Sequence, residues 1–226
     1  METPSIKPEQ VKLLLDAKFI RLYDLQYAPG KHYYDASRRE AGELAAVKPV
    51  EEFRRMLPDA VSCYVILRVP GQEPRLLLFY EYRYPLGQFL LSPPAGLLDA
   101  ADAEAAAKDP QGEPATIRAA RREIFEETGV TVKESDRIFE VSPLVLSTPG
   151  MTDESNALIC AVVDLPDLSC LTQSGAVGSE LFRGFELVTE SQAREILKNG
   201  RDRDGIFYSL MTWSALMYFI SGFWKE

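Results

Sequence analysis

The stretch that decides the fold and the chemistry is RREIFEETGV, residues 121–130. On an α-helix Glu123, Glu126 and Glu127 stand at positions i, i+3 and i+4, so their carboxylates project from one face. Three negative charges placed so closely destabilise an isolated helix, and Arg122 offsets only part of that repulsion. A rigid set of hard oxygen ligands is what Mg²⁺ or Mn²⁺ requires. The spacing therefore predicts a metal-binding helix face, with a solvated acidic surface as the alternative.

This helix is expected to run from Ala115 to Thr128. Pro114 stands near its first turn and Gly129 just past its end, which are the positions that proline and glycine favour. Its apolar stripe consists of Ile117, Ala120 and Ile124. The stripe can pack on a sheet and leave the acidic face toward a cleft.

Four β-rich runs surround the acidic helix. VSCYVILRV (61–69) and RLLLFYEYR (75–83) precede it and are separated by the turn signal PGQEP. IFEVSPLVLS (138–147) and NALICAVVDL (156–165) follow it. Strands that alternate with a few helices predict a layered α/β or α+β architecture.

The N-terminal part is expected to form a segment of its own. Residues 8–16 predict a short helix, Phe19 to Tyr27 a strand, and His32 to Arg38 its hairpin partner. A charged and irregular stretch follows and marks a boundary. We therefore expect an N-terminal β-hairpin segment at residues 1–58, for which the resemblance described below implies a role in dimerisation, and a main domain at residues 59–226.

Three further segments bear on the architecture. The stretch ADAEAAAKDPQGEP (101–114) predicts an inserted surface loop, and Ser191 to Lys198 predicts a helix. Ile206 to Trp224 carries no charged residue and approaches bilayer-spanning length. Because it contains several hydroxyl side chains and follows the charged stretch RDRDG, we expect a buried C-terminal helix, with a membrane anchor as the alternative.

Composition limits the classes of partner. A net charge of −9 argues against nonspecific nucleic-acid binding, which needs a basic face. The start METPSIKPEQ lacks the basic patch and apolar run of a secretory signal. Cys63, Cys160 and Cys170 lack metal-ligand spacing, so we expect free thiols in a reducing compartment. These features predict a cytoplasmic protein with no nucleic-acid or membrane partner.

Several motifs together resemble one family. Arg122 to Val130 matches the core of the Nudix box: Arg-Glu, an aliphatic, any residue, Glu-Glu, any residue, Gly, an aliphatic. Upstream, Pro94-Ala95-Gly96-Leu97 is similar to the segment that opens the box in the ADP-ribose pyrophosphatase branch. Arg83-Tyr84-Pro85 with Gly87 resembles that branch's Arg-x-Pro-x-x-Gly element, and Tyr34 to Arg39 its N-terminal aromatic and acidic segment. The resemblance implies a Nudix-type α/β/α sandwich with a mixed β-sheet, preceded by a small β-rich segment.

The chain departs from the family's pattern at three places. Gly96 lies 26 residues before Arg122, which indicates an insertion of about a dozen residues relative to the box. The slot eight residues before Arg122, normally Glu, holds Pro114, and the neighbouring Glu113 is a candidate substitute. The family often has Glu two residues before Pro-Ala-Gly, where this chain has Ser92. These departures spare the three helix carboxylates.

By resemblance, Glu123 and Glu127, helped by Glu126 and the Ala95 carbonyl, would hold Mg²⁺, with Mn²⁺ as an alternative. Related enzymes place a catalytic glutamate in a loop before the penultimate helix, and Glu180 lies nearest that slot, with Glu126 as the second candidate. The chain's only histidine is predicted to lie in the N-terminal hairpin. The base is therefore expected to be a carboxylate or a metal-bound hydroxide.

Substrate recognition is expected from two arginines and two aromatics. Arg83 and Arg39 can grip phosphate bidentately or stack on a purine. By resemblance, Phe19 and Tyr34 would sandwich an adenine, with the N-terminal segment contributed across the subunits of a homodimer. The alternative for either aromatic is a strand residue packed in a core.

These inferences predict a Mg²⁺-dependent pyrophosphohydrolase that cleaves a nucleoside diphosphate sugar, with ADP-ribose as the first candidate. The motifs do not separate this substrate from GDP-mannose, UDP-glucose, a dinucleotide or FAD. A noncatalytic sensor of ADP-ribose or a similar metabolite is a further alternative, although an intact set of three carboxylates argues against it.

Overall fold

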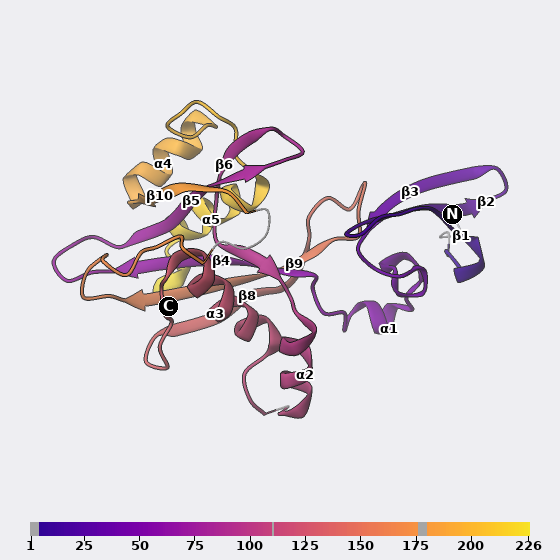
Figure 1. Ribbon diagram of the computed structural model, residues 1–226, viewed down its shortest axis with the longest axis horizontal. Coiled ribbons are helices and arrows are strands. Elements are labelled where there is room, and N and C mark those ends of the chain that lie inside the picture. The colour runs from indigo at the N-terminus through magenta and orange to yellow at the C-terminus, as the bar shows by residue number, and fades with distance from the viewer. Residues whose placement is uncertain (1–4, 110, 176–179) are drawn as a thin grey trace. The chain divides into compact units, whose positions relative to one another are not determined.

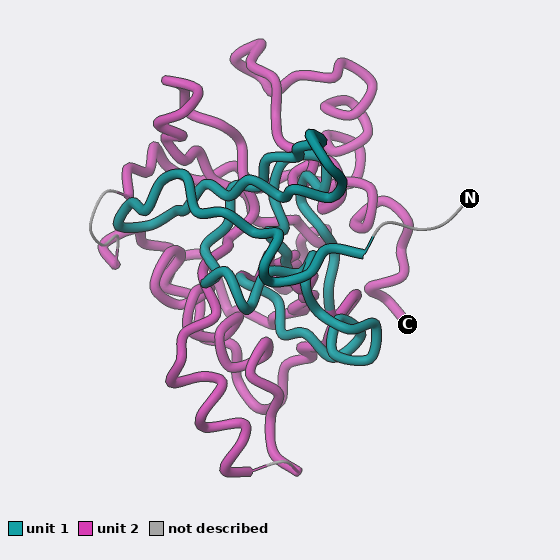
Figure 2. The backbone as a smooth tube through the Cα atoms, turned by 90° about the vertical axis from the view of Figure 1, so that its right-hand side faces the viewer, with its two compact units in different colours: residues 1–59, 144–156 teal, residues 60–143, 157–226 magenta. Residues whose placement is uncertain are grey.

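The computed structural model describes residues 5–109, 111–175 and 180–226. The chain forms two compact units, shown in different colours in Figure 2. Unit 1 comprises residues 1–59 and 144–156, and unit 2 comprises residues 60–143 and 157–226. Each unit is described separately below.

Unit 1 contains a three-stranded antiparallel sheet in the order β1-β2-β3. Its elements are η1 (Pro8–Gln10), β1 (Val11–Asp16), β2 (Arg21–Ala28), β3 (Lys31–Ser37), η2 (Ala41–Glu43), η3 (Ala45–Val47) and α1 (Val50–Phe53). Gly30, at φ 68°, turns the chain between β2 and β3. The two predicted hairpin strands are confirmed.

The helix predicted at residues 8–16 is wrong. Only a single 3-10 turn forms there, and Val11–Asp16 instead pairs along β2, with Val11 opposite Leu25 and Asp16 opposite Arg21. Isolated helices this short are marginal, whereas a strand beside an existing hairpin gains a ladder of backbone hydrogen bonds. Tertiary pairing therefore decided this segment.

Unit 2 is built on the large sheet seen in Figure 1. Its main path has the order β10-β5-β4-β9-β8, while β6 pairs with β5 and β7 with β4. The strands are β4 (Ala60–Arg68), β5 (Arg75–Arg83), β6 (Gln88–Ser92), β7 (Ala95–Leu97), β8 (Arg137–Leu146), β9 (Ser155–Asp164) and β10 (Phe182–Val188). The β-rich runs predicted from the sequence are confirmed as β4, β5, β8 and β9.

Helices cover both faces of this sheet. The helices after β7 are α2 (Ala100–Lys108), α3 (Ala115–Thr128), α4 (Glu190–Asn199) and α5 (Leu210–Ser221), with a last turn η4 (Phe223–Lys225). On one face, α3 packs on strand residues such as Val65 and Leu77. On the other, α4 and α5 pack on residues such as Ile66 and Leu78. The predicted α/β/α sandwich with an N-terminal β-rich segment is confirmed.

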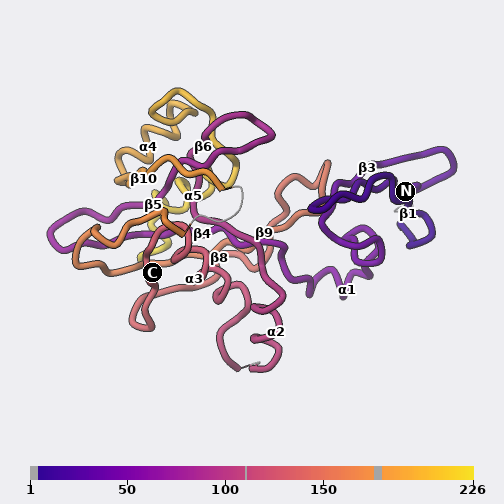
Figure 3. The backbone as a smooth tube through the Cα atoms, viewed as in Figure 1, coloured from indigo at the N-terminus to yellow at the C-terminus, as the bar shows by residue number. Residues whose placement is uncertain are grey.

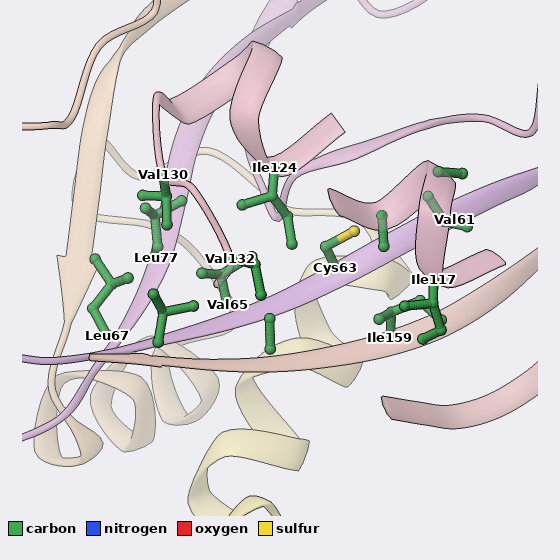
Figure 4. Packing of buried hydrophobic residues seen from close by; sticks show 14 of the residues in the cluster. Val61, Cys63, Val65, Leu67, Leu77, Ile117, Ile124, Val130, Val132 and Ile159 are labelled. Carbon is green, nitrogen blue, oxygen red and sulfur yellow. The ribbon is translucent and has the colours of Figure 1, made fainter. Parts of the chain in front are cut away.

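Helix α3 has the predicted bounds. Gly129 ends it at φ 74°, a left-handed conformation that a side chain would strain. Figure 4 shows Ile117 and Ile124 directed toward the strands beside Cys63. Burying each isoleucine contributes roughly 1.5–3 kcal/mol. The apolar stripe thus fixes the helix on the sheet and sets the direction of its acids.

Two other segments differ in detail from expectation. The predicted surface loop contains α2, because a stretch with six alanines in nine residues has high helix propensity. In α5, Thr212, Ala215, Leu216 and Phe219 are buried, whereas Trp213 is exposed. No helix in the described ranges has the length and apolar character needed to cross a membrane.

Candidate active site

The three acids of α3 differ in their surroundings. Glu123 and Glu127 are buried, with only 8% and 5% of their surface exposed. Glu126 keeps 42% of its side chain exposed. The i, i+4 pair therefore lies against the protein and the third acid borders solvent.

Glu127 is fixed by the Pro-Ala-Gly segment. Its Oε2 accepts the backbone N–H of Ala95 at 2.9 Å. Ala95 itself is held because β7 pairs antiparallel with β4, with Ala95 opposite Ser62. The structure thus brings Ala95 and Glu127 together through the N–H group, and the role of the Ala95 carbonyl as a ligand stays a prediction.

Gly96 allows Glu123 to approach the same strand. A Cβ atom at Gly96 would lie 1.9 Å from Cδ of Glu123 and 2.1 Å from its Oε1. Such distances are far inside van der Waals contact. The glycine is therefore required for the observed position of the Glu123 carboxylate.

Arg122 ties the acidic helix to α2. Its Nη1 lies 2.6 Å from Glu123 Oε1, and its Nη2 lies 3.1 Å from Asp102 on α2. The expectation that Glu113 substitutes at this slot is wrong, because Glu113 pairs with Arg121 at 2.7 Å.

Helix α2 therefore supplies a partner of Arg122 from its first turn. Both α2 and α3 are labelled in Figure 3. Asp102 lies six residues after Gly96, where the box pattern counted forward from its glycine has its acid. Counting backward from Arg122 across the insertion missed it. The extra residues follow Asp102 in the sequence and leave its pairing with Arg122 intact.

Glu180 is held near these acids by the backbone contact of the residue that follows it. Immediately downstream, the carbonyl of Leu181 accepts the N–H of Tyr82 in β5 at 2.9 Å. Glu180 is close enough to interact electrostatically with Glu123 and Glu127.

A fifth acid, Glu81, was not among the predicted site residues. It lies near the end of β5 with 15% of its side chain exposed, and its Oε2 is 2.7 Å from Nη2 of Arg83. Arg83 ends β5, and Gly87 at φ 62° closes the turn to β6. The signal that could have found Glu81 is its position two residues before Arg83, within a strand that otherwise reads as core.

The surroundings of these acids disfavour their charged forms. Burial raises the pKa of Glu127 to about 9, and the carboxylates of Glu123, Glu81 and Glu180 add to the shift against the opposing hydrogen bond from Ala95. Burial also raises the pKa of Glu123, although Arg122 opposes the shift. The site is short of positive charge.

The raised pKa of Glu127 makes a prediction for stability. A carboxyl whose folded-state pKa exceeds its ordinary value favours folding when protonated, and this contribution is lost as pH rises from 4.5 toward about 9. We expect the unfolding free energy of the metal-free protein to fall across that window. Chemical denaturation at several pH values measures it, and saturating Mg²⁺ should flatten the profile. A profile that Mg²⁺ leaves unchanged would contradict a cation bound at these acids.

The residues fit a divalent cation in their chemistry. Carboxylates lie near one another on a helix, a strand and a loop, and Arg122 leaves part of their negative charge uncompensated. Among the described residues, no three His, Cys, Asp or Glu side chains already stand at the spacing that holds a metal ion. Glu123 pairs with Arg122, and Glu127 accepts the N–H of Ala95.

The other predicted binding residues lie in unit 1. Arg39 is largely buried, with its Nη2 2.7 Å from Asp59 and its Nη1 3.1 Å from Asp153. Tyr34, 57% exposed, lines a cavity of about 270 Å³ together with residues that include Phe53, and Phe19 is 70% exposed. Arg39 organises unit 1, so its contact with substrate stays a prediction.

The sequence is similar to those of known proteins. A profile of the Nudix domain matches residues 56–204. The chain is 37% identical to nudix hydrolase 2 of Caenorhabditis elegans over 117 residues, which are 52% of this chain and 44% of that protein. It is 29% identical to the ADP-ribose pyrophosphatase of Saccharomyces cerevisiae over 174 residues, which are 73% of this chain and 65% of that protein. The chain thus spans less than two thirds of these relatives' lengths.

A solved structure of an ADP compounds hydrolase is similar with a TM-score of 0.59 and 16% identity, covering 100% of this chain and 96% of that one. This likeness supports the fold. The predicted resemblance to Nudix hydrolases of the ADP-ribose pyrophosphatase branch is confirmed by the sequence relatives. Because the domain match covers more than half of its residues, the chain belongs to the Nudix family.

Proposed function

We propose that the protein is a Mg²⁺-dependent pyrophosphohydrolase that cleaves ADP-ribose to AMP and ribose 5-phosphate. The observation that carries the proposal is the pair of buried carboxylates on α3, Glu123 and Glu127, held against the Pro-Ala-Gly strand. The similarity to a yeast ADP-ribose pyrophosphatase over 73% of the chain favours this substrate over other nucleotides.

The proposed cation is Mg²⁺, with Mn²⁺ as an alternative, held by Glu123 and Glu127 with Glu126 and the Ala95 carbonyl. When bound, it would neutralise charge on the diphosphate and lower the pKa of a water molecule. Arg83, 45% exposed at the end of β5, would bind a phosphate oxygen. Arg122 would orient Glu123 through their 2.6 Å contact.

Glu180 is the proposed catalytic base, and Glu126 is the second candidate. The attacking water forms a new P–O bond while the P–O bond to the bridging oxygen breaks, and its proton passes to the base. The contact of the adjacent Leu181 with β5 and the electrostatic interaction of Glu180 with Glu123 and Glu127 support this role.

We expect Glu180→Gln to lower kcat by about 100-fold or more, because a positioned base contributes roughly 10²–10⁴. The readout that separates a base from a structural residue is the pH profile, in which the acidic limb should disappear. Glu195→Gln on the exposed face of α4 is the matched control. If Glu180→Gln keeps both kcat and the limb, Glu180 is not the base, and Glu126→Gln tests the second candidate.

The substrate is tested with a panel at fixed Mg²⁺ concentration. ADP-ribose, GDP-mannose, UDP-glucose, a dinucleotide and FAD are compared by the kcat/KM for released monophosphate. A higher kcat/KM for ADP-ribose than for the other compounds supports the proposal. If another compound has the higher kcat/KM, that compound is the substrate instead. Tight binding of ADP-ribose without turnover would instead identify a metabolite sensor.

We propose that residues 1–58 act in dimerisation and adenine binding. The edge strand β1 exposes Leu13, Leu14 and Leu15, a surface suited to a second copy of the chain. Phe19 and Tyr34 are exposed aromatics that can stack on adenine. Light scattering coupled to gel filtration measures the mass, and a monomer at micromolar concentration would contradict the dimer.

We also propose a cytoplasmic location. Its support is that Cys63, Cys160 and Cys170 are all free, and that the first two are buried. Fractionation of cells that express the full-length chain tests the location.

A further inference from the structure

Glu81 lies on the sheet face that α3 covers. Along β5, Leu77 and Phe79 belong to the core packed against Ile117 and Ile124 of α3. The intervening residues, Leu76, Leu78 and Tyr80, belong to the core on the opposite face. Side chains alternate along a strand, so Glu81 continues the row of Leu77 and Phe79. Its carboxylate therefore points to the side that carries Glu123 and Glu127.

The hairpin register places Glu81 beside Ser92. In the antiparallel pair of β5 and β6, Phe79 lies opposite Ser92 and Glu81 lies opposite Leu90. Glu81 and Ser92 are therefore diagonal neighbours on one face, a spacing of roughly 7–8 Å between Cα atoms that a long side chain spans. Ser92 is 2% exposed, and its hydroxyl donates to the carbonyl of Leu90. No charge is present at position 92.

Independent contacts place Glu81 next to the other acids. The residue that follows it, Tyr82, donates its N–H to the carbonyl of Leu181, directly after Glu180. Glu81 interacts electrostatically with both Glu180 and Glu127. It forms an ion pair with Arg83, at 2.7 Å. A carboxylate with 15% exposure is thus held among acids by its ion pair with an arginine.

We propose that Glu81 is a further carboxylate of the cation site and supplies, from β5, the negative charge that β6 lacks at Ser92. The inference rests on the proposed function, because it requires a divalent cation at the acids of α3. The family often has a glutamate where this chain has Ser92, on β6. Glu81 lies instead on the neighbouring strand β5, on the same face of the sheet and at the diagonal position. Acids of α3 and Glu81 of the sheet would then both hold the cation.

The test is Mn²⁺ binding, measured without substrate from the free-ion signal in electron paramagnetic resonance. We expect Glu81→Gln to weaken Mn²⁺ binding by about 10-fold or more. The double variant Glu81→Gln with Ser92→Glu should regain most of that loss, because the new carboxylate starts from the diagonal position. Thermal melting of each variant checks that Ser92→Glu is tolerated at its buried site.

Arg83→Gln tests whether Mn²⁺ binding depends on the charge of Glu81 or on its ion pair with Arg83. It breaks the same ion pair from the other side but keeps the carboxylate, so Mn²⁺ affinity should be unchanged or higher. If Glu81→Gln binds Mn²⁺ as tightly as the unaltered protein, or changes only KM, the inference is overturned whether or not the double variant folds.

Glu127→Gln in the same titration distinguishes a failure of the inference about Glu81 from a failure of the proposed function. If Glu127→Gln loses Mn²⁺ and Glu81→Gln does not, only the inference about Glu81 fails. If the unaltered protein and Glu127→Gln bind Mn²⁺ equally, the cation site at α3 is wrong, and the proposed function fails with it.

Discussion

Replacing Glu127 by glutamine is expected to lower turnover by about two orders of magnitude or more, the loss typical of removing a metal ligand. Glutamine keeps the shape and one acceptor oxygen, so the hydrogen bond from the Ala95 N–H, 2.9 Å in this structure, can remain. The negative charge is removed, and the second oxygen is replaced by an NH₂ group. Steady-state release of AMP from ADP-ribose measures the effect.

A stability measurement on Glu127→Gln tests whether the loss of turnover comes from misfolding. Burial raises the pKa of Glu127 to about 9. Near pH 8 this carboxyl must therefore take up a proton when the metal-free protein folds, which costs free energy. Glu127→Gln should therefore unfold at a higher denaturant concentration than the unaltered protein without Mg²⁺, and should lose much of the pH dependence. A variant that is more stable but inactive cannot be dismissed as misfolded. Near-normal turnover would defeat the assignment of Glu127 to the cation site.

Gly96→Ala is expected to weaken Mn²⁺ binding by roughly 10–100-fold and to reduce turnover in parallel. The new Cβ would stand 1.9 Å from Cδ of Glu123, so the carboxylate must leave its place. The obstructed atoms are the end of a flexible side chain, and Gly96 has no positive φ. The fold should therefore survive, with a small change in melting temperature.

A control and a double variant make this prediction specific. Gly42→Ala meets no atom within 4 Å and should leave Mn²⁺ binding unchanged. If Gly96→Ala acts by displacing Glu123, adding Glu123→Gln should cost little more, because both changes remove the same interaction. Additive losses would show that Gly96 acts through something other than Glu123.

The sequence by itself determined helix α3 and the direction of its acids. The spacing of Glu123, Glu126 and Glu127, the apolar stripe and Gly129 all lie within one stretch of local structure. Periodicity and capping depend on neighbours three or four residues apart, so they can be deduced from the order of residues. The strands on either side were predictable for the same reason.

Partners brought in from distant parts of the chain were not predictable in this way. Counting back from Arg122 pointed to Glu113, whereas Arg122 pairs with Asp102 and Glu113 pairs with Arg121. The count failed because the inserted residues lie between Asp102 and α3 in the sequence. At residues 11–16 the gain from pairing with β2 outweighed a weak local preference for helix.

The order of residues therefore fixed which helix carries the carboxylates, since one turn of backbone sets their spacing. Only the tertiary structure decided that Glu81 and Glu180 join them. One depends on the packing of β5 against α3 and the other on the backbone contact of Leu181 with β5. Both depend on contacts between segments far apart in the chain, which hydrogen bonds and core packing select and local sequence leaves open.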